Sequence, residues 1–150
     1  MKTLIVYASR TGNTEQLASL LYENCSEAGM EAELIRVEEF DLKWLASYAA
    51  CIVVTYTWGS GDLPREILPL FEAFEQTELC GLVTGVAGSG DQCYPDYCGA
   101  VDRFRDMLYA HTRLAVTLKV ELAPQRSDKE KCRKFAEKMI EKAKGAAILN

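Results

Sequence analysis

The chain has 150 residues, of which 49% are hydrophobic and 26% are charged, and this balance predicts one folded domain spanning residues 1–150. Its 22 acidic and 17 basic side chains leave a net charge of −5, which is the wrong sign for a protein that binds nucleic acid. The apolar run at residues 4–8 is too short for a signal peptide or a membrane span, so we expect a cytoplasmic protein with no membrane partner.

The first half of the chain alternates strand patterns with a helix pattern. Residues 2–8 form a short β-rich run, and apolar residues then repeat at helical spacing over residues 17–25. Gly29 marks the end of that helix, and residues 31–37 alternate polar and apolar side chains, which predicts a second strand. Residues 50–56 are continuously apolar, as expected for a third strand in a parallel sheet that is covered on both faces.

The same alternation continues after the third strand. Residues 57–63 form a glycine-rich loop, and Pro64 and Pro69 restrict the backbone, so the next regular helix is expected to begin near Pro69. Residues 82–87 predict a fourth strand. A polar loop over residues 88–99 then separates this strand from the next helix.

The last third of the chain predicts a helix, a strand and a final helix. Val101, Phe104 and Leu108 mark the apolar face of the first helix, and residues 114–122 predict the fifth strand. Ser127 with Glu130 has the spacing of a capping box at the start of the final helix. Five strands that alternate with helices predict an α/β fold, a doubly wound parallel sheet whose ligand site lies at the carboxyl ends of the strands.

The cysteines and the single histidine do not indicate a catalytic or metal site. The six cysteines include no CxxC pair, and nothing in the sequence signals secretion, so reduced thiols are expected. Cys93 and Cys98 have no second pair of ligands at zinc spacing. His111 has no carboxylate or cysteine near it in the sequence. We therefore predict no catalytic residue and no metal ligand.

Six residues between the first strand and the first helix have the composition of an anion site. A helix N-terminus presents free backbone N–H groups and the positive end of the helix dipole. Four hydroxyl or amide side chains add donors, and a glycine permits a tight turn, although such residues also cap helices without any ligand. The pattern is neither a Walker loop nor a GxGxxG loop. It predicts a phosphate site formed by Ser9, Arg10, Thr11, Gly12, Asn13 and Thr14.

Two further loops at the same sheet edge each place an aromatic side chain beside glycines. Taken alone, a loop tryptophan is more often a lid on the core, and a loop tyrosine is more often a surface residue. Together with the phosphate loop, the two aromatic residues indicate a flat, phosphorylated ligand. The loop after the third strand contains Thr57, Trp58, Gly59, Ser60 and Gly61, and the loop after the fourth contains Ser89, Gly90, Asp91 and Tyr94.

These three loops resemble those of the short-chain flavodoxins, and the resemblance covers the whole chain. The run 9–14 is similar to the FMN phosphate loop of that family, residues 57–59 to its second flavin loop, and residues 90–94 with 97–102 to its third. The fifth strand continues into the last helix without a long insertion, which is typical of the short-chain form. The resemblance implies a five-stranded sheet in the order 2-1-3-4-5 and one FMN bound without a covalent link.

The resemblance also implies a role for individual residues. Trp58 and Tyr94 would stack on the two faces of the flavin ring. In the family, the peptide at the position of Gly59 flips when the flavin takes up one electron, and a residue without Cβ makes that flip inexpensive. Backbone groups that would bind the pyrimidine edge of the flavin belong to Ser89, Asp91 and Cys98.

Two positions depart from the family pattern. Relatives often have an acidic residue or glycine where this chain has Ser60, so the stability of the half-reduced flavin does not follow from the resemblance. Arg10 is also less usual in the phosphate loop, and it either contacts the phosphate or faces solvent.

Residues 62–106 carry 9 acidic and 3 basic side chains. This negative charge disfavours a negative flavin and steers a basic partner toward the site.

The sequence therefore predicts a monomeric, low-potential, one-electron carrier rather than an enzyme. By the resemblance, its electron donor would be an NADP-linked ferredoxin or flavodoxin reductase. Its acceptors would be cytochrome P450, desaturase or radical-enzyme systems. The alternative is a flavodoxin-like FMN reductase, such as a quinone reductase, or a dedicated reductase or activator component, although the chain has no spare segment that would form a substrate pocket.

Overall fold

The computed structural model describes residues 2–149, which form five strands and four helices, with three short 3-10 helices between them. The strands are β1 (Lys2–Tyr7), β2 (Glu31–Arg36), β3 (Ala50–Tyr56), β4 (Val83–Gly90) and β5 (Arg113–Glu121). The helices are α1 (Asn13–Glu27), α2 (Leu68–Gln76), α3 (Gly99–His111) and α4 (Arg126–Leu149), and the 3-10 helices are η1 (Val37–Glu39), η2 (Leu42–Ser47) and η3 (Arg65–Ile67).

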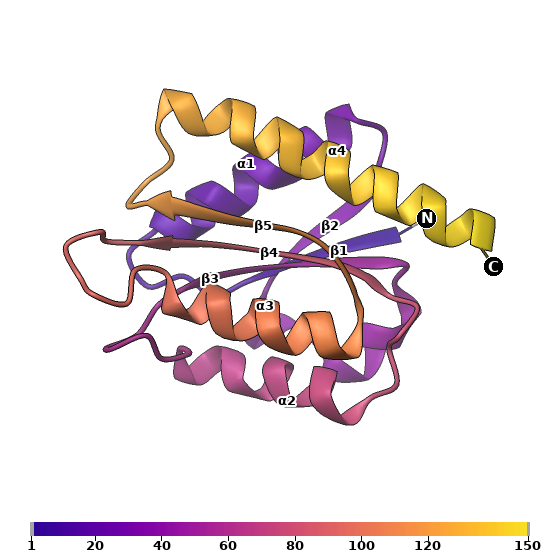
Figure 1. The fold of residues 1–150 in the computed structure, drawn as a ribbon, viewed down its shortest axis with the longest axis horizontal. Coiled ribbons are helices and arrows are strands. Elements are labelled where there is room, and N and C mark those ends of the chain that lie inside the picture. The colour runs from indigo at the N-terminus through magenta and orange to yellow at the C-terminus, as the bar shows by residue number, and fades with distance from the viewer. Residues whose placement is uncertain (1, 150) are drawn as a thin grey trace.

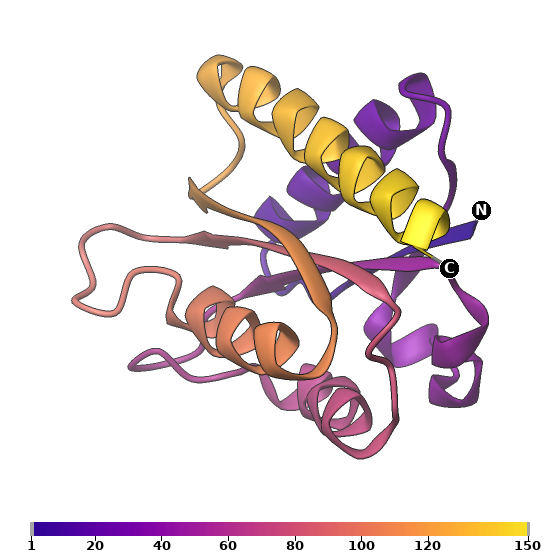
Figure 2. The same ribbon diagram turned by 45° about the vertical axis from the view of Figure 1, so that its right-hand side comes forward.

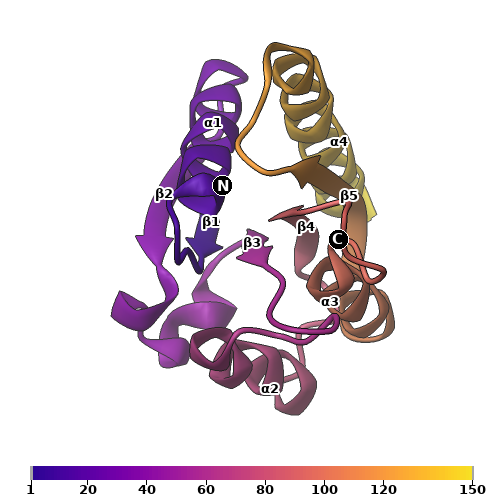
Figure 3. The ribbon, with the colours of Figure 1, turned by 90° about the vertical axis from the view of Figure 1, so that its left-hand side faces the viewer.

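The strands form one parallel sheet in the order β2-β1-β3-β4-β5, which confirms the predicted fold class and strand order. Helices α1 and α4 cover one face of the sheet, and α2 and α3 cover the other (Figures 1 and 3). The winding direction reverses between β1 and β3, so the carboxyl ends of these strands border the crevice where such sheets bind ligands. Within residues 2–149, no helix is both long enough and apolar enough to span a bilayer.

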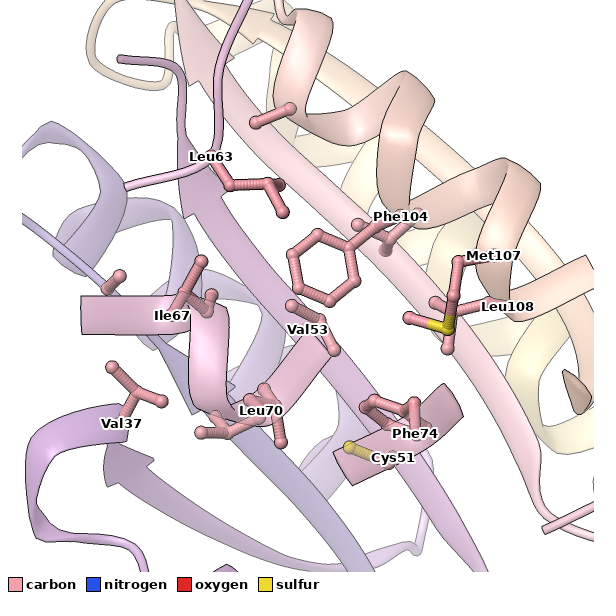
Figure 4. Close-up of a cluster of buried hydrophobic side chains, with 14 of the residues drawn as sticks. Val37, Cys51, Val53, Leu63, Ile67, Leu70, Phe74, Phe104, Met107 and Leu108 are labelled. Carbon is pink, nitrogen blue, oxygen red and sulfur yellow. The ribbon is translucent and has the colours of Figure 1, made fainter. Parts of the chain in front are cut away.

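Apolar side chains fill the space between the sheet and each helical layer. On the α2 and α3 side, Phe74 and Phe104 are fully buried and pack over Val53 of the central strand (Figure 4). On the α1 and α4 side, Leu17 and Phe135 belong to a second buried cluster. The central strands are buried on both faces because each face has its own helical layer, and this explains their continuously apolar sequences.

Strand β4 is longer than the sequence predicted, because it runs to Gly90 instead of ending at residue 87. Residues expected in a loop pair on both sides: Ser89 lies opposite Tyr56 of β3 and Val120 of β5. A Cβ on Gly88 would lie 2.3 Å from a methyl carbon of Val101, so this glycine permits α3 to approach the strand. The glycines that indicated a loop instead allow close packing at the end of a strand.

The predicted capping box of the last helix is wrong, because α4 begins at Arg126 and Ser127 lies inside it. The residue that performs this role is Asp128, which is 6% exposed and accepts a hydrogen bond from the Gln125 amide at 2.7 Å. A carboxylate at the third helical position that bonds back to the cap amide is one half of a capping box. The cap therefore begins at Gln125, two residues before the predicted position.

Candidate functional site

Three loops meet at the carboxyl edge of the sheet (Figures 2 and 3). We call them the first loop (residues 8–12), the second loop (residues 57–63) and the third loop (residues 91–98). They follow β1, β3 and β4, and the structure therefore brings the three predicted groups of site residues to one edge. Asn13 and Thr14, expected in the first loop, form the first turn of α1.

The first loop bends around the N-terminus of α1 and leaves amide donors available there. Gly12 precedes the helix in the left-handed conformation, with a φ of 95°. The hydroxyl oxygen of Ser9 accepts hydrogen bonds from the amides of Gly12 and Glu15, both at 3.2 Å. The amides of Asn13 and Thr14 lie in the first helical turn, where no intrahelical acceptor exists. Such amides, together with the helix dipole, favour binding of an anion.

Side chains outside the loop hold it in place, and sequence reasoning missed the most important of them. The Arg36 guanidinium donates to the Ser9 carbonyl oxygen at 3.1 Å and to the Glu15 carboxylate at 2.9 Å. The hydroxyl of Thr14 hydrogen-bonds that of Ser89 at 2.7 Å, which joins the first turn of α1 to the end of β4. No local signal marks Arg36, because its alternation pattern only assigns it to a strand.

The second loop is a narrow turn held by a pair of backbone hydrogen bonds. The amide of Trp58 donates to the carbonyl of Asp62, and the amide of Asp62 donates to the carbonyl of Trp58, both at 2.8 Å. Gly59 and Gly61 in this turn have φ values of 52° and 86°, in the left-handed region that favours glycine. Arg103 of α3 bonds the Asp62 carboxylate at 3.3 Å and ties the turn to that helix.

The third loop is organised by Asp91. Its carboxylate accepts a hydrogen bond from the Cys93 amide at 2.8 Å, and its carbonyl accepts one from the Tyr94 amide at 3.1 Å. At the other end of the loop, Cys98 has a φ of 52° and precedes α3, while its thiol lies 3.8 Å from the Gly88 carbonyl oxygen. Burial raises the pKa of the Cys98 thiol to about 11, so it is protonated at neutral pH and acts as a packing group.

The second loop packs against the start of α3 and, together with the third loop, lines a cavity. The hydroxyl oxygen of Thr57 accepts a hydrogen bond from the Ala100 amide at 3.1 Å. A Cβ on Gly99 would lie 2.7 Å from the Cα of Gly61, so glycine is needed for this approach. The cavity beside this contact has a volume of about 270 Å³. It is lined by Thr57, Gly59, Gly90, Asp91, Tyr94, Asp96, Tyr97 and Cys98.

The two predicted stacking residues are both exposed at this edge. Trp58 is 49% exposed and Tyr94 is 64% exposed, values that are high for such large aromatic side chains. Trp58 also lines a second cavity of about 530 Å³, and the Arg10 guanidinium lies 4.7 Å from the centre of its ring. The side chain of Arg10 therefore stacks on the tryptophan.

The donor set of this edge fits a flat ligand that carries a phosphate. Free amides at the start of α1 can bind an anion, exposed aromatic rings can stack on a planar group, and residues of the third loop line the adjoining cavity. Among residues 2–149, no group of three or more metal-binding side chains is found. Ser60 is exposed in the second loop, between the paired residues Trp58 and Asp62.

Comparison with known proteins identifies the family. The flavodoxin family model matches residues 5–135. "Probable flavodoxin 1" of Bacillus subtilis is 42% identical over 138 residues, which cover 90% of this chain and 87% of that protein. The solved flavodoxin of Streptococcus pneumoniae TIGR4 is 32% identical with a TM-score of 0.90, covering 95% of this chain and 99% of its own. A short-chain flavodoxin associated with a bacterial microcompartment is 29% identical with a TM-score of 0.91, over 95% and 99% of the two chains. The chain belongs to the flavodoxin family of flavin-dependent electron carriers.

Proposed function

We propose that the three loops hold one FMN without a covalent bond, and that the chain carries single electrons between redox proteins. The observation that carries this proposal is the pairing of free amides at the start of α1 with two exposed aromatic rings at the same sheet edge. With its phosphate bound by the amides at the start of α1, FMN would have its flavin ring beside the two exposed aromatic side chains. When bound, the flavin takes up and releases one electron at a time.

Each loop contributes a different part of the proposed site. Hydroxyls, amides and the Asn13 side chain of the segment 9–14 bind the phosphate. Trp58 and Tyr94 stack on the ring and disfavour negative charge on it. When the bound flavin is reduced and gains an N–H group, the carbonyl of Gly59 could turn toward that group. A residue without Cβ adopts either peptide orientation at low cost. Backbone groups at Ser89, Gly90, Asp91 and Cys98 bind the polar edge of the flavin ring. Ser60 and Gly61 of the second loop lie beside this edge.

The same arrangement favours a carrier over a reductase. The aromatic residues are exposed, so a partner can approach the flavin directly, and the loops are short. We propose a single flavodoxin-like domain over residues 1–150 that acts as a cytoplasmic monomer. Its partners would be an NADP-linked reductase as donor and cytochrome P450, desaturase or radical-enzyme systems as acceptors, and it would bind neither nucleic acid nor membranes.

An anaerobic reductive titration of the purified protein tests this function. We expect a yellow protein that releases FMN on denaturation and passes through a blue, one-electron-reduced form on the way to full reduction. The apoprotein should bind riboflavin far more weakly than FMN, because riboflavin lacks the phosphate that the first loop would bind. Direct two-electron reduction would favour the reductase alternative, and equal affinity for the two flavins would contradict the phosphate site.

A further inference from the structure

Arg10 makes a contact that the phosphate site does not explain. Its guanidinium lies 4.7 Å from the centre of the Trp58 ring, within the range of a cation–π interaction. The backbone around Arg10 is held by neighbouring residues: the Ala8 amide donates to the Val54 carbonyl at 3.0 Å, and the Ser9 carbonyl accepts from Arg36. The stack therefore joins the first loop, whose backbone is restrained, to the Trp58 side chain of the second loop.

The indole of Trp58 needs such a partner because its own surroundings are open. Its backbone is fixed by the hydrogen bonds to Asp62, but the side chain is 49% exposed and projects beside a cavity of about 530 Å³. An exposed side chain of this size has several accessible rotamers. A planar guanidinium that covers one ring face restricts them and leaves the opposite face for a stacking ligand.

The charge of Arg10 is not cancelled by a direct ion pair. Two carboxylates line the same cavity, but each has another partner: Glu66 accepts a hydrogen bond from the Tyr56 hydroxyl, and Glu38 lies 3.9 Å from Arg36. Within residues 2–149, no carboxylate lies within salt-bridge distance of the Arg10 guanidinium. A full positive charge thus lies against the ring of Trp58.

We propose that Arg10 is a positioning residue that holds the Trp58 indole in its stacking orientation and, through its charge, eases the second one-electron reduction of the flavin. The inference deepens the proposed function and rests on it. The first reduction adds an electron and a proton to a neutral ring, so a nearby positive charge changes it little. The second step leaves an anionic ring, which a positive charge stabilises.

Measurement of both one-electron potentials in charge variants tests the electrostatic part. Arg10→Gln should weaken binding of fully reduced FMN about fourfold relative to half-reduced FMN, for a charge at roughly 8 to 10 Å and an effective dielectric near 50. This fourfold change corresponds to a second potential that is lower by about 35 mV, because each tenfold change in relative affinity shifts a one-electron potential by about 59 mV. Arg10→Lys keeps the charge and should keep the second potential. Arg65→Gln is the matched control, because Arg65 lines the same cavity without stacking on Trp58.

Fluorescence of the apoprotein tests the positioning part without any flavin. Trp44→Phe leaves Trp58 as the sole tryptophan of the chain. On that background, Arg10→Gln and Arg10→Lys should both make the Trp58 indole more accessible, so that acrylamide quenches its fluorescence more strongly. Arg65→Gln should leave the quenching unchanged. If FMN does not bind at all, the proposed function fails, and the quenching experiment still decides whether the stack exists.

Two results would overturn the inference. The first is an Arg10→Gln protein whose second potential and quenching both equal those of the parent. The second is an Arg65→Gln protein that shifts the second potential as much as Arg10→Gln does, because the effect would then be a general property of surface charge rather than of the stack on Trp58.

Discussion

Asp91 shows how one side chain both shapes the third loop and controls the chemistry of a neighbour. Its carboxylate accepts the Cys93 amide at 2.8 Å and so fixes the turn that presents Tyr94. The same carboxylate accepts a hydrogen bond from the exposed Cys93 thiol and repels its thiolate, which raises the pKa of that thiol. An exposed cysteine in this loop is therefore less reactive than its exposure alone indicates.

The Asp91→Asn variant should release this restraint. Without the carboxylate the pKa of Cys93 falls, so the thiolate fraction at about pH 8 rises and alkylation by iodoacetamide becomes faster. Mass spectrometry of the peptide that contains Cys93 measures the rate. The exposed Cys80, which precedes β4 at the opposite end of that strand from the third loop, serves as the internal reference. An unchanged ratio of the two rates would show that Asp91 does not control this thiol.

At the scale of the elements, the start of α4 depends on a single buried carboxylate. The Asp128 side chain is buried and accepts a hydrogen bond from the Gln125 amide at 2.7 Å. Glu130, the residue of the capping box predicted from the sequence, is exposed and contacts Arg133. Helix α4 covers β4 and β5 and packs against α1. Its first turn is therefore coupled to one whole face of the sheet.

Replacing the two acidic residues separately distinguishes the true cap from the predicted one. Asp128→Ala should lower the free energy of unfolding by about 1 kcal/mol, since the cap amide loses its acceptor. Glu130→Ala should change it by less than about 0.5 kcal/mol, as expected for an exposed ion pair. Urea unfolding of both variants measures the difference. Equal losses would contradict the assignment of the cap to Asp128.

The elements were predictable from sequence to the extent that they depend on local patterns. The five strands and the helical faces follow from hydrophobic periodicity, and the strand order follows from the resemblance to the short-chain flavodoxins. The residues of all three loops meet at the predicted edge. What the sequence could not predict depends on residues distant along the chain. The end of β4 is decided by close packing of Gly88 against Val101, the first loop is held by Arg36, and Arg10 meets Trp58 only after folding.

At the scale of the whole molecule, an acidic segment and a basic helix lie on opposite faces of the sheet. Residues 62–106, with 9 acidic and 3 basic side chains, form the end of the second loop, the third loop, β4, α2 and most of α3 (Figure 3). Residues 107–150, with 5 acidic and 10 basic side chains, include all of α4 on the opposite layer. A basic partner is therefore attracted to the side of the molecule that carries the acidic segment 62–106, in a complex that salt weakens.

Paired variants on the two layers separate this oriented steering from the effect of net charge. Glu72→Gln with Glu75→Gln on α2 should lower the rate of electron transfer to a basic cytochrome roughly two- to fivefold at low ionic strength, and the difference should vanish near about 0.5 M salt. Lys131→Gln with Lys134→Gln on α4 changes the net charge by the same amount in the opposite sense, but on the far layer, so the rate should stay near that of the parent. Stopped-flow kinetics measures both. Equal and opposite changes from the two pairs would mean that the cytochrome responds to total charge alone, and the acidic segment 62–106 would then have no part in orienting it toward the flavin.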